Sequence, residues 1–285
     1  MRDVINMARR KTSLETIYIN SWTMFQEVVA GPKYRSWAFR GHADARWPLY
    51  STISRYLREH RVDQKAWAGQ EERIVRIFRR KAHLFLEHVP AESDAFQWLA
   101  LMQHHGAPTR LVDFTWSPFV AAFFALERAT TDAAVWALCF PEIWKARHKF
   151  PDKKERVTED QLSLRIPGNY ERFFLGNRVP FIVTGEPLVM NQRLVAQSGT
   201  FVVAGVLDRP VEDVLSTYPN PKKTVAKFVL NTKKIRDEAM YAFYNMNITN
   251  ATLFPGLDGM ARSLAYELEF HWAYDPKTMK RYPGY

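Results

Sequence analysis

Residues 97–126 constrain the fold of this chain most strongly, because helix, turn, strand and helix signals follow one another there without a linker. Gly106 and Pro108 end the first helix, and the proline keeps the residue before it out of helical dihedrals. His104 and His105 come directly before this break. We therefore expect both histidines at a tight polar turn.

The second half of this stretch predicts a strand that runs directly into a helix. Residues 111–114 have strand character, and Ser117 followed by Pro118 is typical of a helix N-cap and a first helical residue. Thr115 and Ser117 are therefore expected at a strand-to-helix corner. Ser117 is expected to cap the helix whatever else it does.

The composition allows a large core and a basic surface. The chain has 285 residues, of which 47% are hydrophobic, enough for one elaborated domain. It has no apolar run of about 18 residues and no signal-peptide core, so we expect a cytoplasmic protein without a membrane partner. Cys139 is the only cysteine, which excludes a disulfide within the chain. The net charge of +10 favours a polyanionic partner, with nucleic acid first.

Periodicity along the chain predicts a mixture of helices and strands. A capping-box helix is expected to start at Thr23, with Gln26 as its second member. The stretch at 142–178 is rich in charged residues and predicts an exposed insertion. Strands are expected at 34–39, 111–114, 133–140, 179–183, 193–195, 200–207 and 225–230, and later helices at 211–218, 232–247 and from 258 past 269.

Arg40 is predicted to project from the end of a strand. Gly41 follows it and would let a ligand approach the backbone closely. A guanidinium is a planar fork that suits phosphate groups, whereas a surface salt bridge is the ordinary alternative.

The run at 70–88 predicts an amphipathic helix with one basic face. Its apolar stripe includes Ile77 and Phe85. The basic face is interpreted either as solvated or as facing nucleic acid. The basic residues assigned to nucleic-acid binding are Arg73, Arg76, Arg79 and Arg80.

Four motifs stand in order along the chain: the tripeptide Phe39-Arg40-Gly41, the block at 98–125, the run at 193–201 and LFPGLDGMA at 253–261. Together they resemble the FRG domain family over about residues 37–265. Members of this family are associated with phage defence and toxin-like roles. The resemblance therefore implies a toxin–antitoxin or antiphage setting, with an antitoxin or chaperone as a possible partner protein.

A more distant resemblance is to ADP-ribosyltransferases, which place an arginine at the end of one core strand and a hydroxyl residue where a second strand enters a helix. The resemblance implies a split central sheet and NAD as a substrate that acts in place of a cofactor. In it the arginine holds phosphate or ribose, and the hydroxyl orients the arginine or the ribose. The residues it assigns to NAD binding are Phe39, Arg40, Gly41, Thr115 and Ser117.

The third ADP-ribosyltransferase element is different here, because residues 191–203 contain no glutamate. Asp113, or Glu267 and Glu269 near the C-terminus, could supply a carboxylate from elsewhere. The arginine in this stretch also resembles RNA 2′-phosphotransferases, which use arginines and a histidine. Such a set here would be His104, Arg110 and Arg193.

Each candidate has a structural alternative. Arg110 and Asp113 could form a buried ion pair, and Gln197 could satisfy turn backbone. The two histidines could be capping or core residues, and as zinc ligands they lack a third partner, so no metal is expected. The predicted catalytic set is Arg40, His104, Arg110, Asp113, Ser117, Arg193 and Gln197.

The sequence thus predicts one α+β domain over 1–285, with an ADP-ribosyltransferase-like split central β-sheet flanked by helices. A helical N-terminal extension at 1–33 and a helical C-terminal addition complete it. The predicted function is a toxin-like ADP-ribosyltransferase that moves ADP-ribose from NAD to nucleic acid, with RNA as the favoured target. The alternative is a non-catalytic nucleic-acid-binding FRG module that uses the Arg40 pocket as a phosphate clamp. A nuclease is disfavoured, because no acidic metal cluster is visible.

Overall fold

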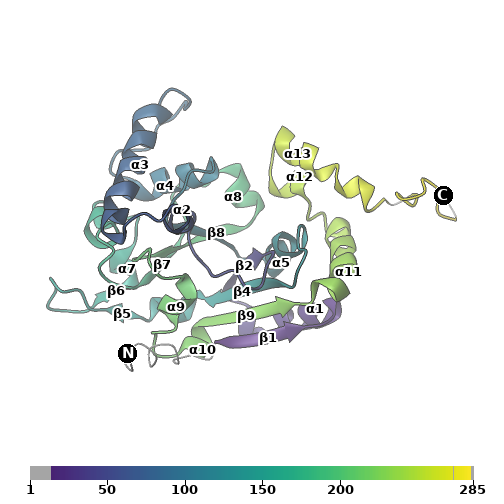
Figure 1. Cartoon of the computed structure of the whole chain (residues 1–285), viewed down its shortest axis with the longest axis horizontal. Helices are drawn as coiled ribbons and strands as arrows, with labels where there is room; N and C mark the ends of the chain where they lie inside the picture. Colours follow the sequence, from purple (N-terminus) through teal and green to yellow (C-terminus); the bar gives the residue numbers. More distant parts are fainter. Residues whose placement is uncertain (1–13, 272, 284–285) are drawn as a thin grey trace.

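A seven-stranded sheet with helices on both faces forms the centre of the computed structural model, which describes residues 14–271 and 273–283 (Figure 1). The strand order is β1-β9-β4-β2-β3-β8-β7. The pair β1 and β9 is parallel, and the other five pairs are antiparallel. The predicted α+β class is confirmed at this level.

The elements of the described chain have the following bounds. The sheet contains β1 (Glu15–Ile19), β2 (Trp37–His42), β3 (Leu111–Thr115), β4 (Ala133–Cys139), β7 (Ile182–Gly185), β8 (Gly199–Ala204) and β9 (Val225–Leu230), and a separate hairpin contains β5 (Arg147–His148) and β6 (Val157–Thr158). The α-helices are α1 (Trp22–Ala30), α2 (Thr52–Glu59), α3 (Trp67–Ala82), α4 (Ala95–His104), α5 (Pro118–Leu126), α6 (Phe140–Trp144), α7 (Glu159–Leu162), α8 (Gln192–Ala196), α9 (Val211–Leu215), α10 (Pro221–Thr224), α11 (Thr232–Asn245), α12 (Asn250–Leu253) and α13 (Leu257–Ser263). Shorter helical turns are η2 (Pro32–Tyr34), η3 (Gln64–Ala66), η4 (Tyr170–Phe174) and η5 (Tyr266–Leu268).

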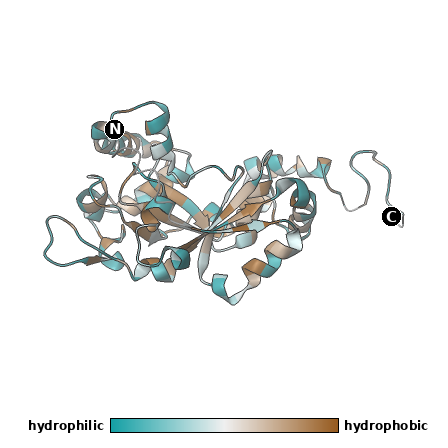
Figure 2. Cartoon of the chain, turned by 60° about the horizontal axis from the view of Figure 1, so that its bottom comes forward, coloured by the Kyte–Doolittle hydropathy of each residue, from teal (hydrophilic) through white to brown (hydrophobic). Residues whose placement is uncertain are grey.

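Three hydrophobic clusters hold the helices to the sheet, and Figure 2 shows the hydrophobic strands between more hydrophilic helices. One cluster packs α1, α5 and α11 against β2, β4 and β9. A second packs α3, α4 and η4 against β3, β7 and β8. The third covers the opposite face of both halves with α6 and α9.

The sheet is divided between β2 and β3. These strands share one residue pair, Phe39 with Thr115, whereas β2 pairs with β4 over six residues and β3 with β8 over five. The two halves therefore meet at a narrow junction, and the strands part on either side of it. This junction is where the functional residues gather.

Gly41 is required for helix packing. A Cβ atom at this position would lie 2.0 Å from the carbonyl oxygen of Ala121 and 2.6 Å from the backbone nitrogen of Ala125. Helix α5 therefore rests directly on β2, as close helix–strand packing at glycine allows. The expectation that this glycine makes room for a ligand is corrected, because α5 occupies that space.

Several predicted elements are wrong or shifted. Residues 193–195 lie in helix α8, because the Asn191 side chain accepts a hydrogen bond from the Leu194 N–H at 2.8 Å and caps the helix. Ser21, not Thr23, caps α1 through the Met24 N–H. The helix expected from 258 past 269 ends at Ser263, and the strand expected at 34–39 runs instead from Trp37 to His42. Short apolar runs do not separate strand from helix, and local caps decide the outcome.

Two predicted additions belong to the main body. The stretch at 142–178 was expected to be exposed, but Phe150, Leu162 and Phe174 are buried in the second hydrophobic cluster. The N-terminal extension is not wholly helical, because β1 pairs with β9 at the sheet edge. Residues 1–13 of that extension lie outside the described residues. No described helix combines the length and the apolar character needed to cross a membrane.

Candidate functional site

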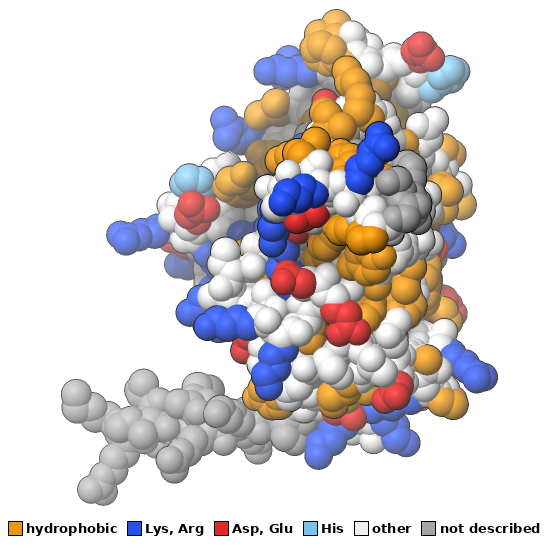
Figure 3. Space-filling model, turned by 90° about the vertical axis from the view of Figure 1, so that its right-hand side faces the viewer, with side chains coloured by type: hydrophobic (Ala, Val, Ile, Leu, Met, Phe, Trp, Pro, Cys, Tyr) orange, Lys and Arg blue, Asp and Glu red, His pale blue; other side chains and the backbone are white. Residues whose placement is uncertain are grey.

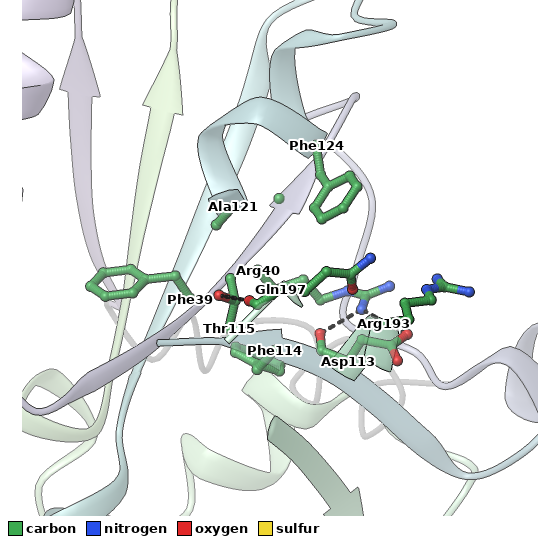
Figure 4. A pocket seen from close by; sticks show the side chains of 10 residues that line it. Phe39, Arg40, Asp113, Phe114, Thr115, Ala121, Phe124, Arg193 and Gln197 are labelled. Carbon is green, nitrogen blue, oxygen red and sulfur yellow. Dashed lines mark hydrogen bonds and ion pairs between the residues drawn. The ribbon is translucent and has the colours of Figure 1, made fainter. Parts of the chain in front are cut away.

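A cavity of about 230 Å³ lies at the junction of the two sheet halves (Figure 4). The end of β2 and the end of β3 form two of its sides, and α5 and α8 supply the others. Helix α8 ends beside β8 because the chain turns sharply at Ser198, which has φ 45°. The lining residues are Phe39, Arg40, Gly41, Asp113, Phe114, Thr115, Ala121, Phe124, Arg193 and Gln197.

Arg40 is held in the cavity by three partners. Its Nη1 donates to the backbone oxygen of Asp113 at 2.6 Å and lies 3.6 Å from the Asp113 carboxylate, and its Nε donates to His42 Nε2 at 3.2 Å. The side chain is 20% exposed. Burial lowers the pKa of the Arg40 guanidinium, and the Asp113 charge acts in the opposite direction. No described residue bonds Nη2, so this edge of the fork is available to a ligand.

His42 is a site residue that sequence reasoning missed. Arg40 Nε can only donate, so His42 Nε2 must accept, and the ring proton therefore lies on Nδ1 and is donated to the Trp47 oxygen at 3.2 Å. Burial and the Arg40 charge lower the pKa of His42 to about 3. A neutral imidazole thus orients the arginine without neutralising it. Its position two residues after Arg40, on the same face of β2, was the available signal.

Asp113 is fixed by a short chain of hydrogen bonds. Thr109 Oγ1 donates to Gln103 Oε1 at 2.7 Å, and Gln103 Nε2 donates to Asp113 Oδ2 at 2.8 Å. The Asp113 side chain is still 45% exposed and faces the cavity. Among the described residues that line the cavity, it is the only carboxylate. Gln103 was treated in the sequence only as part of the turn.

Thr115 joins β3 to α8 and α5. Its hydroxyl donates to the Gln197 backbone oxygen at 2.6 Å and accepts from the Ser117 N–H at 3.0 Å. Ser117 caps α5 by accepting from the Val120 N–H, as predicted, and does not line the cavity. The Gln197 side chain donates to the Leu253 backbone oxygen at 2.9 Å, which ties α8 to α12. Gln197 therefore does satisfy backbone, but backbone of a distant segment.

Arg193 and His104 lie on the side of the cavity that opens beside α4. A smaller hollow here shares Asp113, Arg193 and Gln197 with the main cavity and adds His104. His104 Nδ1 is buried without a hydrogen-bond partner among the described residues. Burial, His105 and Arg193 all lower the pKa of His104, so its imidazole is neutral at neutral pH.

Arg110 does not belong to the site, which corrects its prediction as a catalytic residue. Its guanidinium is fully buried and forms a bidentate pair with the buried carboxylate of Glu71. Its remaining donors bond the backbone oxygens of Ala204 and Phe174 at 2.9 and 3.1 Å. The ion pair expected with Asp113 is therefore made with Glu71, which the sequence gave no reason to select.

The basic helix α3 lies away from the cavity, and none of its residues lines it. Arg79 packs against Trp98 at 5.5 Å from the ring centre, and Arg73 bonds Gln70 on the same helix. Arg76 and Arg80 are exposed. The helix ends at Ala82, and the predicted stripe residues Ile77 and Phe85 are exposed instead of buried.

The C-terminal glutamates do not reach the cavity. Glu269 pairs with Arg236 at 3.1 Å, and Glu267 lies on the exposed turn η5. Neither lines the cavity, so the carboxylate available there is Asp113. Within the described ranges, no group of three or more His, Cys, Asp or Glu side chains is placed to hold a metal ion.

Comparison with known proteins identifies one domain. A model of the FRG domain family matches residues 35–134, a range that contains β2, α4, β3 and α5 and so most of the cavity. The chain therefore contains an FRG domain. No curated protein and no solved structure matches the chain.

Proposed function

We propose that this protein is a toxin-like ADP-ribosyltransferase that transfers ADP-ribose from NAD to nucleic acid, with RNA as the favoured target, in a toxin–antitoxin or antiphage setting. The observation that carries the proposal is the placement of Arg40. It stands at the junction of a divided sheet, oriented by a neutral histidine and a backbone oxygen, with one guanidinium edge free. That arrangement suits a phosphate oxygen of NAD.

The cavity fits one end of NAD. Pockets that enclose a whole ligand typically measure roughly 300–1,000 Å³, and the enclosed space here is about 230 Å³. It therefore suits the nicotinamide ribose, with Phe39 and Phe124 as apolar walls. The phosphates would lie at the Arg40 guanidinium.

The proposed reaction needs positioning and charge stabilisation more than a strong nucleophile. The bond between the nicotinamide nitrogen and ribose C1 breaks, a nucleophile of the acceptor bonds C1, and nicotinamide and a proton leave. Asp113 would stabilise the positive charge that develops at the sugar, because it is the described carboxylate in the cavity. Neutral His104 is the group suited to accept the proton of the acceptor.

Incubation of the purified protein with NAD labelled in the adenylate, together with RNA, DNA and protein acceptors, tests the proposal. We expect label on RNA and release of nicotinamide, and loss of both with Asp113→Asn. Transfer only to protein would overturn the nucleic-acid target. Binding of RNA without any NAD consumption would favour the non-catalytic phosphate clamp instead.

A further inference from the structure

A second hollow lies on the far side of Phe254 from the cavity. It measures about 310 Å³ and is lined by the end of α5, by α11 and by the C-terminal helices. Its charged residues are Glu127, Arg128, Arg236, Arg262 and Glu269. Figure 3 views the molecule from this side and shows Lys and Arg side chains standing among hydrophobic ones.

Phe254 connects the hollow to the cavity. The Arg193 guanidinium lies 4.7 Å from the centre of its ring, and the Arg262 guanidinium lies 5.6 Å from the same centre. Phe124 meets the ring edge-on at 5.9 Å and itself lines the cavity. Arginine and aromatic groups therefore alternate from the cavity wall to the second hollow.

The segment that carries Phe254 is held rigidly. Gly256 has φ 124°, a conformation that favours glycine, and a Cβ atom on Gly259 would lie 1.8 Å from the Phe254 oxygen. The Leu253 oxygen accepts from the Gln197 side chain, and Asn250 is buried and donates to Glu127. The corner between α12 and α13 thus presents its aromatic ring in a fixed position.

Two arginines at the second hollow have no counter-charge. Arg236 pairs with Glu269, and the Glu127 carboxylate accepts from Asn250. Arg128 and Arg262 are exposed and form no ion pair with any described residue. Arg193 likewise has no ion pair within the described chain. Three unneutralised cations therefore follow one another away from the cavity.

We propose that this row, Arg193, Phe254, Arg262 and Arg128, binds the single-stranded nucleic-acid acceptor and leads it into the cavity. The inference deepens the proposed function and rests on it for the acceptor role. Cations interleaved with aromatic rings are the usual means of holding an unpaired strand, with phosphates on the cations and bases against the planar groups. The row begins at Arg193, which lines the cavity, so a strand lying along it reaches the proposed site of transfer.

The test compares charge reversals at this row with matched reversals elsewhere. Arg128→Glu and Arg262→Glu, combined in one variant, would be compared with Arg76→Glu and Arg80→Glu on α3, which change the net charge equally. Binding of a labelled single-stranded RNA oligonucleotide would be measured from low to moderate salt. We expect the first variant to lose roughly tenfold or more in affinity and its salt slope to fall by about 2, since each lost phosphate contact removes about 1.

The outcomes separate this inference from the proposed function, because binding is measured without NAD. Lost RNA binding in the row variant supports the row even if no NAD is consumed, and then only the transferase proposal fails. Equal losses in both variants would show that net charge and not this row binds RNA, which overturns the inference. Weaker NAD binding with unchanged RNA binding would also overturn it, because the row would then belong to NAD.

Discussion

Two arginines on neighbouring strands of this protein have opposite surroundings. Arg110, just before β3, is fully buried, and its donors are taken by a carboxylate and two backbone oxygens. Arg40, on β2, is partly exposed and is held by an imidazole and one backbone oxygen, with its nearest carboxylate contact at 3.6 Å. The first arginine is saturated, and the second retains donor capacity.

The difference separates a structural arginine from a functional one. A buried guanidinium needs a close counter-charge and full hydrogen bonding, because desolvation of an unpaired charge costs several kcal/mol. The Glu71 pair meets this need for Arg110. Arg40 is oriented mainly by neutral groups, so its charge is still available to an anion.

The largest effect is expected from breaking the saturated pair. Arg110→Met leaves the buried Glu71 without its partner, and we expect the free energy of unfolding to fall by about 3–5 kcal/mol. Urea unfolding followed by circular dichroism would measure this loss.

The matched control replaces both partners. Glu71→Leu combined with Arg110→Met removes the charge that the single variant leaves unpaired, so it should recover part of the lost stability. If the double variant is less stable than Arg110→Met alone, the buried pair contributes more than its charges, and the contrast with Arg40 would need another explanation.

The next largest effect is expected on activity, at Arg40. Arg40→Lys removes the fork but keeps a positive charge, so we expect normal folding and a fall in NAD turnover of about 10² or more. Arg46→Lys, on the exposed turn that follows β2, is the control and should be silent. Near-normal turnover by Arg40→Lys would refute the role of Arg40 as a bidentate phosphate ligand.

The sequence predicted the local features of the site better than its assembly. Ser117 as N-cap and β3 leading into α5 follow from residue types within a few positions, and both are confirmed. That Arg40 and Asp113 meet follows from the pairing of β2 with β3 across 73 positions of sequence, which periodicity does not encode. The partner of Arg110 was missed for the same reason, since Glu71 lies on α3, 39 positions away.

Two other misses arose from residues with more than one use. Gly41 was interpreted as room for a ligand, but a strand glycine serves close helix packing equally well, and only the position of α5 decides between them. The run at 193–195 has strand-like composition, yet the cap supplied by Asn191 makes it a helix. That helix brings Arg193 to the cavity wall.

A third prediction sharpens the comparison through the neutral partner of Arg40. Unfolded His42 has a pKa near 6.5, and folding lowers it to about 3, so between these values the unfolded state binds a proton that the folded state does not. The contribution is complete above about pH 6.5 and is lost as pH falls, at up to about 1.4 kcal/mol per pH unit. Urea unfolding at pH 7, 6 and 5 should therefore show a shallower acid loss for His42→Gln than for the parent.

Other buried groups titrate in both proteins and cancel in this difference. Burial lowers the pKa of His148 to about 4, which acts in the same direction as His42. Burial raises the pKa of Glu212 to about 7, so its contribution grows as pH falls from 7. Parallel curves for the parent and His42→Gln would mean that His42 is not held neutral beside Arg40.

The smallest effect is expected at arginines in a third setting, fully solvated. Arg76 and Arg80 are exposed on α3, and no residue of that helix lines the cavity. Exposed charges contribute about 0–1 kcal/mol through pairing and are screened by salt. Reversal of both should therefore change stability by less than about 1 kcal/mol and RNA affinity only slightly above about 0.15 M salt. A salt slope reduced by about 2 in this variant would instead show that α3 contacts phosphates. The functional arginines of the protein would then include solvated ones, and free donor capacity inside the cavity would no longer distinguish Arg40.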